Sequence, residues 1–327
     1  MHAIRLHAFG PAENLTYEET DTPTPGPGQV RIAVAAAGVH VLDTALREGE
    51  TGPLPAPAEL PTIPGREVAG TVDALGEGAD PGWLGKNVVA HLGMVPGGYA
   101  EAAVTDATRL HEIPDGLDPA EAVAMIGTGR TTLGILQFTE LGPDSIAIVP
   151  AAAGGIGTLL VQYAKNAGAT VIGLAGGEAK TARVRENGAD AAVDYTRPDW
   201  PAHVREFLGP RTATIVFDSV GGDTGRAAVD LLGKGGQHLV FGWRADTPLT
   251  FTDDELAARG ITSESVLGPK MLEKAGGDIR TLELRALAEA AAGRLRPAIH
   301  RFPLAEAAAA HRALETRGTT GKVVLIP

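Results

Sequence analysis

Short apolar segments separated by proline and glycine dominate the first third of the chain. Residues 30–35, 67–75, 87–91 and 99–104 each have the length and composition of a β-strand, and the opening segment alternates apolar and polar side chains. This pattern predicts a β-rich, partly barrel-like domain, which we place at residues 1–120.

From about residue 119 the hydrophobic spacing becomes helical, and strand and helix patterns then alternate. The spacing is that of β-α-β units, which build a parallel, doubly wound sheet. We place this domain at residues 121–267, inserted in the first, and expect residues 268–327 to return to the first domain. The predicted fold class is therefore α/β. The predicted helices are 119–126, 131–141, 155–167, 178–187, 199–208, 223–233 and 279–293, and the predicted strands are 145–150, 170–174, 191–193, 213–217, 237–241 and 322–326.

The strongest chemical signal is a glycine-rich turn between a predicted strand and a predicted helix. It has the spacing Ala152-x-Gly154-x-x-Gly157, a variant of the dinucleotide-binding fingerprint. A side chain at Gly154 would keep a pyrophosphate away from the backbone, and Gly157 lets the helix pack closely on its strand. A tight structural turn is the alternative. The predicted cofactor contacts here are Ala153, Gly154, Gly155, Ile156 and Gly157.

The end of the next strand decides which dinucleotide fits. An NAD site places an acid there for the ribose 2′-hydroxyl, whereas this chain has Gly176, followed by Lys180, Arg183 and Arg185. Small residues with nearby cations accept the 2′-phosphate of NADPH, which an acid would repel. We therefore predict NADPH. Glu178 leaves NAD open, and the three cations could alternatively form a solvated helix face.

Composition narrows the classes of function. The 28 basic and 40 acidic residues give a net charge of −12, which argues against a nucleic-acid or anionic-membrane partner. With no cysteine, the chain has no disulfide, cysteine nucleophile or thiolate metal site. Pro150 and several glycines interrupt the apolar stretch 146–164, so we expect no membrane span. These features suggest a soluble, cytoplasmic protein.

Ordered motifs run along the whole chain. They include Ala37-Gly38-Val39-His40, Pro64-Gly65-Arg66-Glu67, Gly97-Gly98-Tyr99-Ala100-Glu101, Phe217-Asp218-Ser219-Val220-Gly221-Gly222, Phe241-Gly242 and Gly321-Lys322-Val323-Val324-Leu325. With the glycine-rich turn, they resemble the medium-chain dehydrogenase/reductase superfamily, specifically its zinc-independent quinone oxidoreductase branch. The resemblance implies a GroES-like catalytic domain, an inserted Rossmann domain, NADPH in the cleft between them, and a homodimer.

The resemblance also implies roles for individual residues. Thr131 matches a hydroxyl beside the nicotinamide, and Lys180 and Tyr195 match contacts to the 2′-phosphate. His40 stands where this branch usually has asparagine, and Ala45 stands where an aromatic residue near the substrate is common, which suggests a more open pocket. The further implied cofactor contacts are Gly176, Val220, Phe241 and Gly242.

The zinc-dependent branch of the superfamily takes its catalytic ligands from three positions. In this chain they are His40, Arg66 and about Gly127. Only His40 could bind a metal, and a catalytic zinc needs three protein ligands, so we predict no metal site. Asp43 and Glu67 are interpreted as structural partners that pair with Arg66.

The predicted activity is hydride transfer from NADPH to a small-molecule acceptor, a quinone or an α,β-unsaturated carbonyl compound. Thr131 and His40 are candidate hydrogen-bond donors to the acceptor oxygen, and a satisfied core histidine is the equal alternative for His40. Two alternative functions stay open. One is a nucleotide-binding protein without catalysis, structural or RNA-associated, and the other is an acyl-chain enoyl reductase.

We place the interface of the predicted homodimer at an exposed sheet edge. Residues 247–252, in which Leu249 and Phe251 alternate with polar residues, are predicted as an edge strand. Apolar residues within 260–267 could pack across the same two-fold seam. A loop or helix of the same chain covering that edge is the alternative.

Overall fold

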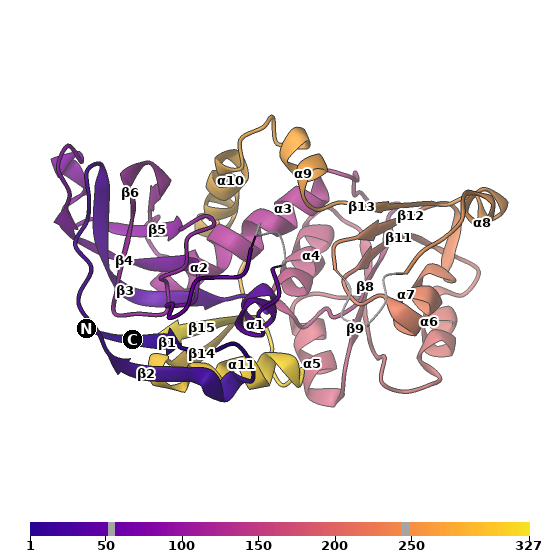
Figure 1. The fold of residues 1–327 in the computed structure, drawn as a ribbon. Helices are drawn as coiled ribbons and strands as arrows, with labels where there is room; N and C mark the ends of the chain where they lie inside the picture. The colour runs from indigo at the N-terminus through magenta and orange to yellow at the C-terminus, as the bar shows by residue number, and fades with distance from the viewer. Residues whose placement is uncertain (52–55, 243–248) are drawn as a thin grey trace. The chain divides into compact units, whose positions relative to one another are not determined.

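The structure is a computed structural model that describes residues 1–51, 56–242 and 249–327. The chain divides into two compact units, which Figure 1 shows with their helices and strands labelled. The domain ranges inferred from the sequence, 1–120, 121–267 and 268–327, stay a prediction, because a division into compact units does not by itself define functional domains. Unit 1 comprises Met1–Thr128, Ala286–Ala291 and Pro297–Pro327, and unit 2 comprises Gly129–Arg285 and Ala292–Arg296.

Unit 1 is built around the long strand β3 (Gln29–Val39). This strand pairs with β4 (Glu67–Leu75), β6 (Ala102–Asp106) and β15 (Lys322–Ile326), so the last strand of the chain lies beside one from near its beginning. The sheet order is β14-β15-β3-β4-β5-β7, with β6 also on β3. Other elements of unit 1 are β1 (His2–Leu6), β2 (Leu15–Glu19), α1 (Val41–Arg47), β5 (Asn87–His91), β7 (Leu110–Glu112), α2 (Pro119–Ala124), β14 (Ile299–Pro303) and α11 (Ala307–Glu315).

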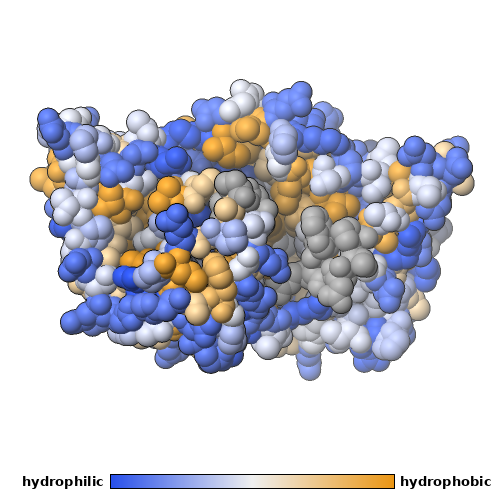
Figure 2. Space-filling model, viewed as in Figure 1, coloured by the Kyte–Doolittle hydropathy of each residue, from blue (hydrophilic) through white to orange (hydrophobic). Residues whose placement is uncertain are grey.

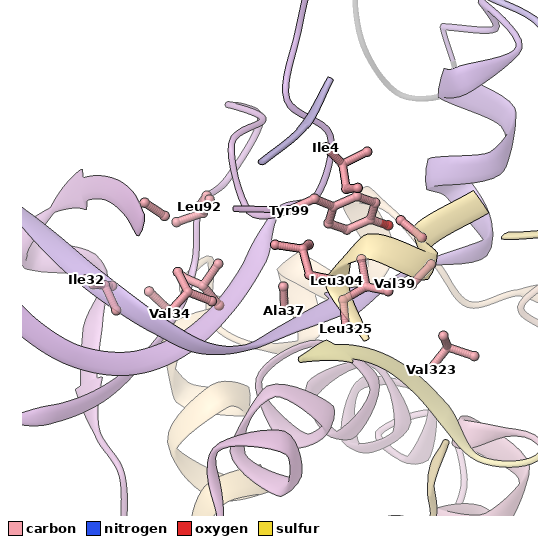
Figure 3. Close-up of a cluster of buried hydrophobic side chains, with 14 of the residues drawn as sticks. Ile4, Ile32, Val34, Ala37, Val39, Leu92, Tyr99, Leu304, Val323 and Leu325 are labelled. Atoms are coloured by element: carbon pink, nitrogen blue, oxygen red, sulfur yellow. The ribbon is translucent and has the colours of Figure 1, made fainter. Parts of the chain in front are cut away.

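Apolar side chains from distant parts of the sequence form the core of unit 1 (Figure 3). Ile4 on β1, Ile32 on β3 and Leu325 on β15 are at most 1% exposed. Strands with one buried face place every second side chain in such a core. Tyr99 also lies in this core, ahead of β6, so the strand predicted from residue 99 begins only at Ala102.

Unit 2 contains a six-stranded parallel sheet in the order β10-β9-β8-β11-β12-β13. In chain order this is 3-2-1-4-5-6, and the order reverses between β8 and β11. The prediction of a doubly wound α/β fold is therefore confirmed. The strands are β8 (Ile146–Val149), β9 (Thr170–Ala175), β10 (Ala191–Asp194), β11 (Ala213–Asp218), β12 (Leu232–Val240) and β13 (Thr262–Ser265).

Helices connect the parallel strands of unit 2. Gln162 on helix α4 exchanges two hydrogen bonds with the backbone of Arg296, at 2.9 and 2.7 Å, which fastens residues 292–296 to this unit. Helix α10 contributes residues to both units. The helices are α3 (Arg130–Leu136), α4 (Gly155–Asn166), α5 (Glu178–Glu186), α6 (Trp200–Leu208), α7 (Gly222–Val229), α8 (Asp253–Arg259), α9 (Pro269–Lys274) and α10 (Arg280–Ala291).

Between residues 229 and 237 of unit 2, a predicted helix end and a predicted strand start are wrong by several residues. The helix predicted at 223–233 ends at Val229, and the strand predicted at 237–241 begins already at Leu232. The first residues of β12 pair irregularly. The register of the pairing with β11 shifts there, and Gly235 has φ +83°. Because glycines are typical of turns, the sequence pattern hides this part of the strand.

The predicted edge strand at 247–252 is wrong for the part that the structure describes. Residues 249–252 are not a strand and lead into helix α8, because the Thr252 side chain caps its first turn. Phe251 packs against the same unit, with the Arg226 guanidinium 4.2 Å from its ring centre. Residues 247–248 lie outside the described residues.

Strand β13 forms the outer edge of the parallel sheet next to β12. Ile261 and Val266, which flank β13, are 6% and 0% exposed within the single chain. They are therefore packed inside unit 2 and do not form the seam that the sequence suggested. The homodimer stays a prediction.

The surface mixes charged and apolar residues. On the face drawn in Figure 2, hydrophilic residues predominate and apolar residues gather in smaller groups. Among the described residues, none of the helices combines the length and apolar character that a membrane crossing requires.

Candidate functional site

The glycine-rich turn lies at the carboxyl end of β8, where the strand order of the parallel sheet reverses. Gly154 is the N-cap of helix α4, so the helix begins directly from the turn. The first backbone N–H groups of a helix have no partner within the helix, and together with the helix dipole they favour an anion. The predicted residues 153–157 form this helix start.

Steric contacts explain two of the glycines. A Cβ on Gly157 would lie 2.7 Å from Cα of Ala152 and closer still to the Ala151 oxygen, so only glycine permits this packing of turn and helix. A Cβ on Gly154 would meet only the Ala151 oxygen, at 3.2 Å. Gly154 therefore keeps open a space outside the turn that a side chain would fill, and this space suits a pyrophosphate.

The predicted 2′-phosphate residues gather at the carboxyl ends of β9 and β10. Ala175 and Asp194 pair across these strands, and the backbone N–H of Tyr195 donates to the Ala175 oxygen at 3.2 Å. Gly176 follows β9 directly, and Lys180 lies in the first turn of helix α5, half-buried. The fold thus brings these three predicted residues to one corner of the sheet.

Asp194 is a residue of this corner that sequence reasoning missed. Its carboxylate accepts hydrogen bonds from the Gly177 backbone and from both the N–H and the hydroxyl of Thr196, and these bonds lower its pKa. Asp194 therefore holds the Gly176–Gly177 turn. The two neighbouring cations point elsewhere: Arg183 is 69% exposed beside Glu186, and Arg185 donates to the Ala192 oxygen.

The carboxyl ends of β11 and β12 carry the predicted residues Val220, Phe241 and Gly242. The Asp218 carboxylate accepts hydrogen bonds from the backbone N–H groups of Val220 and Gly221 at 2.8 and 2.9 Å. The backbone carbonyl oxygen of Asp218 accepts a further hydrogen bond from the Phe241 N–H. Asp218 thus orders both segments at once.

A buried histidine holds Asp218 in place. His238 Nε2 lies 3.1 Å from the Asp218 carboxylate, and both side chains are fully buried. Burial alone would raise the pKa of Asp218, but the bonds from His238 and the loop backbone outweigh it and lower that pKa. Because a single sequence does not show which strands are neighbours, the partnership of Asp218 with His238 was not predicted.

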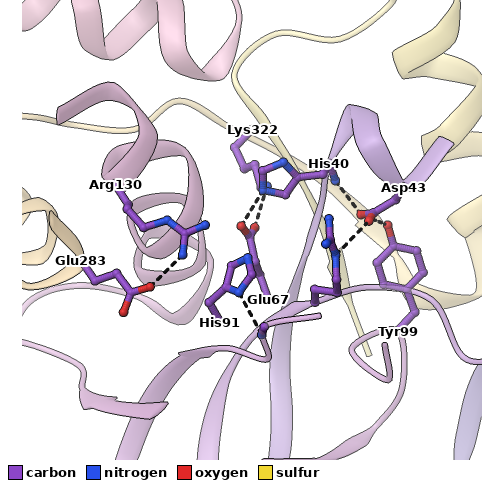
Figure 4. A network of polar contacts seen from close by, with 10 residues as sticks. His40, Asp43, Glu67, His91, Tyr99, Arg130, Glu283 and Lys322 are labelled. Carbon is purple, nitrogen blue, oxygen red and sulfur yellow. Dashed lines mark hydrogen bonds and ion pairs between the residues drawn. The ribbon is translucent and has the colours of Figure 1, made fainter. Parts of the chain in front are cut away.

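In unit 1, His40 belongs to a polar cluster with Glu67 and Lys322 (Figure 4). His40 Nε2 lies 2.5 Å from one Glu67 carboxylate oxygen, and the Lys322 ammonium donates to the other at 2.7 Å. Glu67 is fully buried and the Lys322 side chain is 5% exposed, whereas the His40 side chain is 32% exposed. His40 is thus the accessible end of a buried charge cluster.

The charges in this cluster keep Glu67 ionised. Burial by itself would raise the pKa of the Glu67 carboxyl, but the charges of His40 and Lys322 and the hydrogen bond from His40 hold it well below its ordinary value. An ionised carboxylate can only accept, so Glu67 orients the imidazole of His40.

A second buried network holds the backbone of His40. The Asp43 carboxylate accepts the His40 N–H at 2.8 Å and the Tyr99 hydroxyl at 2.9 Å. Arg66 Nε lies 4.0 Å from Asp43, so that predicted pairing is present at long range. The prediction that Arg66 also pairs with Glu67 is wrong, because Lys322 and His40 take up the Glu67 carboxylate.

Thr131, the second predicted donor, lies half-buried in the first turn of helix α3 in unit 2. Next to it, the Arg130 guanidinium donates to Glu283 at 2.8 Å, which ties this helix start to α10. Within residues 1–51, 56–242 and 249–327, no group of three or more His, Cys, Asp and Glu side chains is placed to hold a metal ion.

Comparisons with known proteins agree with this arrangement. The family model described as "Alcohol dehydrogenase GroES-like domain" matches residues 26–115, and the one described as "Zinc-binding dehydrogenase" matches residues 155–282. The chain is 34% identical to a quinone oxidoreductase of Pseudomonas aeruginosa, over 99% of each chain. The chain belongs to the medium-chain dehydrogenase/reductase superfamily, in its quinone oxidoreductase-like branch. The family and fold predicted from the sequence are confirmed.

Two further similarities concern cofactor and substrate. The chain is 32% identical to a 2-haloacrylate reductase of a Burkholderia species, over 99% of this chain and 98% of the relative. It also resembles the crystal structure of Escherichia coli quinone oxidoreductase in complex with NADPH, with a TM-score of 0.85, 27% identity and all of both chains covered.

Proposed function

We propose that this member of the superfamily is an NADPH-dependent reductase that transfers a hydride, without zinc, to a quinone or an α,β-unsaturated carbonyl compound. The glycine-rich helix start at the reversal of the strand order is the observation that carries the proposal. It supplies the anion-binding backbone and the open space at Gly154 that a dinucleotide needs. NADPH in the related quinone oxidoreductase structure supports the choice of cofactor.

The chain's own residues have three tasks in this proposal. The turn at 153–157, with Val220, Phe241 and Gly242, holds the dinucleotide, and Gly176, Lys180 and Tyr195 receive the 2′-phosphate. When bound, NADPH supplies a hydride from its nicotinamide. Thr131 and His40 donate hydrogen bonds to the acceptor oxygen, on which negative charge develops, and His40 does so through Nδ1 because Glu67 holds its Nε2.

The surroundings of His40 suit an organic acceptor better than a metal. Val41, the next residue in the chain, is apolar and 46% exposed. Glu67, the only acid that contacts the His40 ring among the described residues, is already neutralised by the Lys322 ammonium. A divalent cation would have to displace that buried ammonium, so we propose catalysis without zinc.

Replacing Lys180 by alanine tests the cofactor assignment. We expect the affinity for NADPH to fall by about 1–3 kcal/mol, the range for a hydrogen bond to a charged group, with that for NADH nearly unchanged. Titration of the intrinsic fluorescence with each cofactor measures both. Arg183→Ala removes a neighbouring but 69% exposed cation and is the matched control, expected to bind both cofactors normally. Equal losses for NADPH and NADH in Lys180→Ala would contradict the assignment.

A cofactor-oxidation assay against quinones, enones, enoyl thioesters and aldehydes tests the reaction. We expect NADPH-dependent turnover of quinones and enones that a zinc chelator does not reduce. NADPH binding without turnover of any acceptor would favour the non-catalytic alternative. Preference for enoyl thioesters would favour the acyl-chain alternative, and loss of activity with the chelator would refute zinc independence.

A further inference from the structure

Arg66 differs from Lys322 and Arg47, the two most deeply buried cations of unit 1. Its side chain is 10% exposed, and its Nε is a buried nitrogen without a hydrogen-bond partner among the described residues. Its nearest carboxylate oxygen, on Asp43, is 4.0 Å away, beyond hydrogen-bonding distance. By contrast, Lys322 donates to Glu67 at 2.7 Å and Arg47 donates to the Gly10 oxygen at 2.8 Å.

Asp43 does not reach Arg66 within hydrogen-bonding distance. One of its oxygens already accepts the His40 N–H and the Tyr99 hydroxyl. Asp43 therefore balances the charge of Arg66 at a distance without satisfying its donors. A guanidinium has five N–H donors in a planar fork, and burying any of them without an acceptor, as at Nε of Arg66, is unfavourable. Acceptors supplied by a bound molecule would remove this penalty.

Arg66 lies beside His40 through shared partners. Arg66 directly precedes Glu67, whose carboxylate contacts the His40 ring, and it faces Asp43, whose carboxylate holds the His40 backbone. Figure 4 shows His40, Asp43 and Glu67 of unit 1 together. Arg66 and the His40 backbone thus share Asp43 as a neighbour, which puts Arg66 close to the residue that we propose contacts the acceptor.

We propose that Arg66 binds the carboxylate of the acceptor, so that the acceptors of this enzyme include small α,β-unsaturated carboxylic acids. The inference rests on the proposed hydride transfer and narrows its substrate class. The planar guanidinium matches a carboxylate with two parallel hydrogen bonds, which a neutral carbonyl cannot provide. The name of the 2-haloacrylate reductase relative denotes a substrate of this chemistry.

The reaction explains why a cation is needed at this point. A hydride adds to the β-carbon, the C=C π electrons move toward the carboxylate, and a proton from solvent ends on the α-carbon. The products are the saturated carboxylate and the oxidised nicotinamide. The carboxylate is already an anion, so the added electron pair makes the intermediate an enediolate dianion, with its two negative charges shared by the two oxygens. Arg66 stabilises that charge more than it stabilises the bound substrate.

Arg66→Gln tests the proposal with three acceptors: 2-chloroacrylate, its methyl ester and 1,4-benzoquinone. We expect kcat/KM for 2-chloroacrylate to fall about 10- to 100-fold, as for loss of a charge-assisted pair, and kcat/KM for the two neutral acceptors to change less than about threefold. Arg66→Lys keeps the positive charge but lacks the planar guanidinium. It should therefore lower kcat/KM for 2-chloroacrylate less than Arg66→Gln does. Arg31→Gln, which removes a cation paired with Asp73 on the surface, is the matched control and should leave all three unchanged.

Binding measured without turnover separates this inference from the proposed function. Calorimetric titration with 2-chloropropionate, a saturated carboxylate, should detect binding to the wild type and a loss of at least tenfold in Arg66→Gln. Equal losses for all three acceptors, or unchanged carboxylate binding in a folded Arg66→Gln variant, would show that Arg66 is only a structural partner of Asp43. Carboxylate binding without NADPH oxidation by any acceptor would instead refute the hydride transfer.

Discussion

Replacing Lys322 by methionine should lower the free energy of unfolding by about 3–5 kcal/mol, the effect of removing one partner from a buried ion pair. Glu67 is fully buried, and the Lys322 ammonium is 2.7 Å from its carboxylate. Methionine fills a similar volume but leaves that carboxylate without its main permanent counter-charge. Denaturant unfolding of the wild type and the variant at pH 7.5 measures the difference.

An exposed pair in the same unit is the matched control. Lys86 and Glu112 are 2.9 Å apart but 47% and 58% exposed, so Lys86→Met should cost less than about 1 kcal/mol. Lys322→Met combined with Glu67→Gln removes both charges and should recover part of the lost stability. A Lys322→Met variant no less stable than Lys86→Met would contradict the assignment of Lys322 and Glu67 as a strong buried pair.

Acid should destabilise the protein already between pH 7 and 5, because of His311. This residue is fully buried on helix α11, 3.2 Å from the Tyr99 hydroxyl. Burial first, and then the charge of Arg47, lower its pKa from 6.5 to about 4, against the opposing charges of Asp43 and Glu315. The unfolded chain therefore binds a proton over a range in which the folded chain does not. Stability should fall by about 2 kcal/mol between pH 7 and 5, and by about 3 kcal/mol at pH 4.

Histidine variants isolate this contribution. His311→Gln should be less stable than the wild type at pH 7 but should lose less stability on acidification to pH 5. Carboxyl groups with lowered pKa values, such as Glu67, change the free energy of unfolding only at lower pH. Between pH 7 and 5 the change therefore comes from histidine. His7→Gln replaces a 52% exposed histidine and should keep the wild-type pH dependence. An unchanged pH dependence in His311→Gln would show that His311 does not carry the effect.

Local patterns predicted the parallel sheet of unit 2 well. Apolar runs, glycine-rich turns and helical spacing alternate, so most strands and helices there begin and end within a residue or two of their predicted positions. The errors have local causes. The helix predicted at 131–141 ends at Leu136, although its apolar spacing continues to Leu141. Such spacing does not show where tertiary contacts end a helix.

Contacts between distant residues were the part that the sequence could not predict. Residues 125–129 form a π-helical turn, and a Cβ on Gly127 would collide with the Glu67 carboxylate. Gly127 is thus needed because a buried acid from β4 lies against it. The motifs identified His40, Glu67 and Lys322 separately, but only the pairing of β15 with β3 shows that they form one cluster.

The Glu67–Lys322 pair also bears on the chemical survival of the protein. Quinones and unsaturated carbonyl compounds are electrophiles that form covalent adducts with thiols and free amines. This chain has no cysteine, and the buried amine nearest His40 is an ammonium whose proton points to a carboxylate, without a lone pair for attack. Thiols are thus absent from the chain, and the amine that shares Glu67 with His40 is blocked, so alkylation by an electrophile at this cluster is disfavoured.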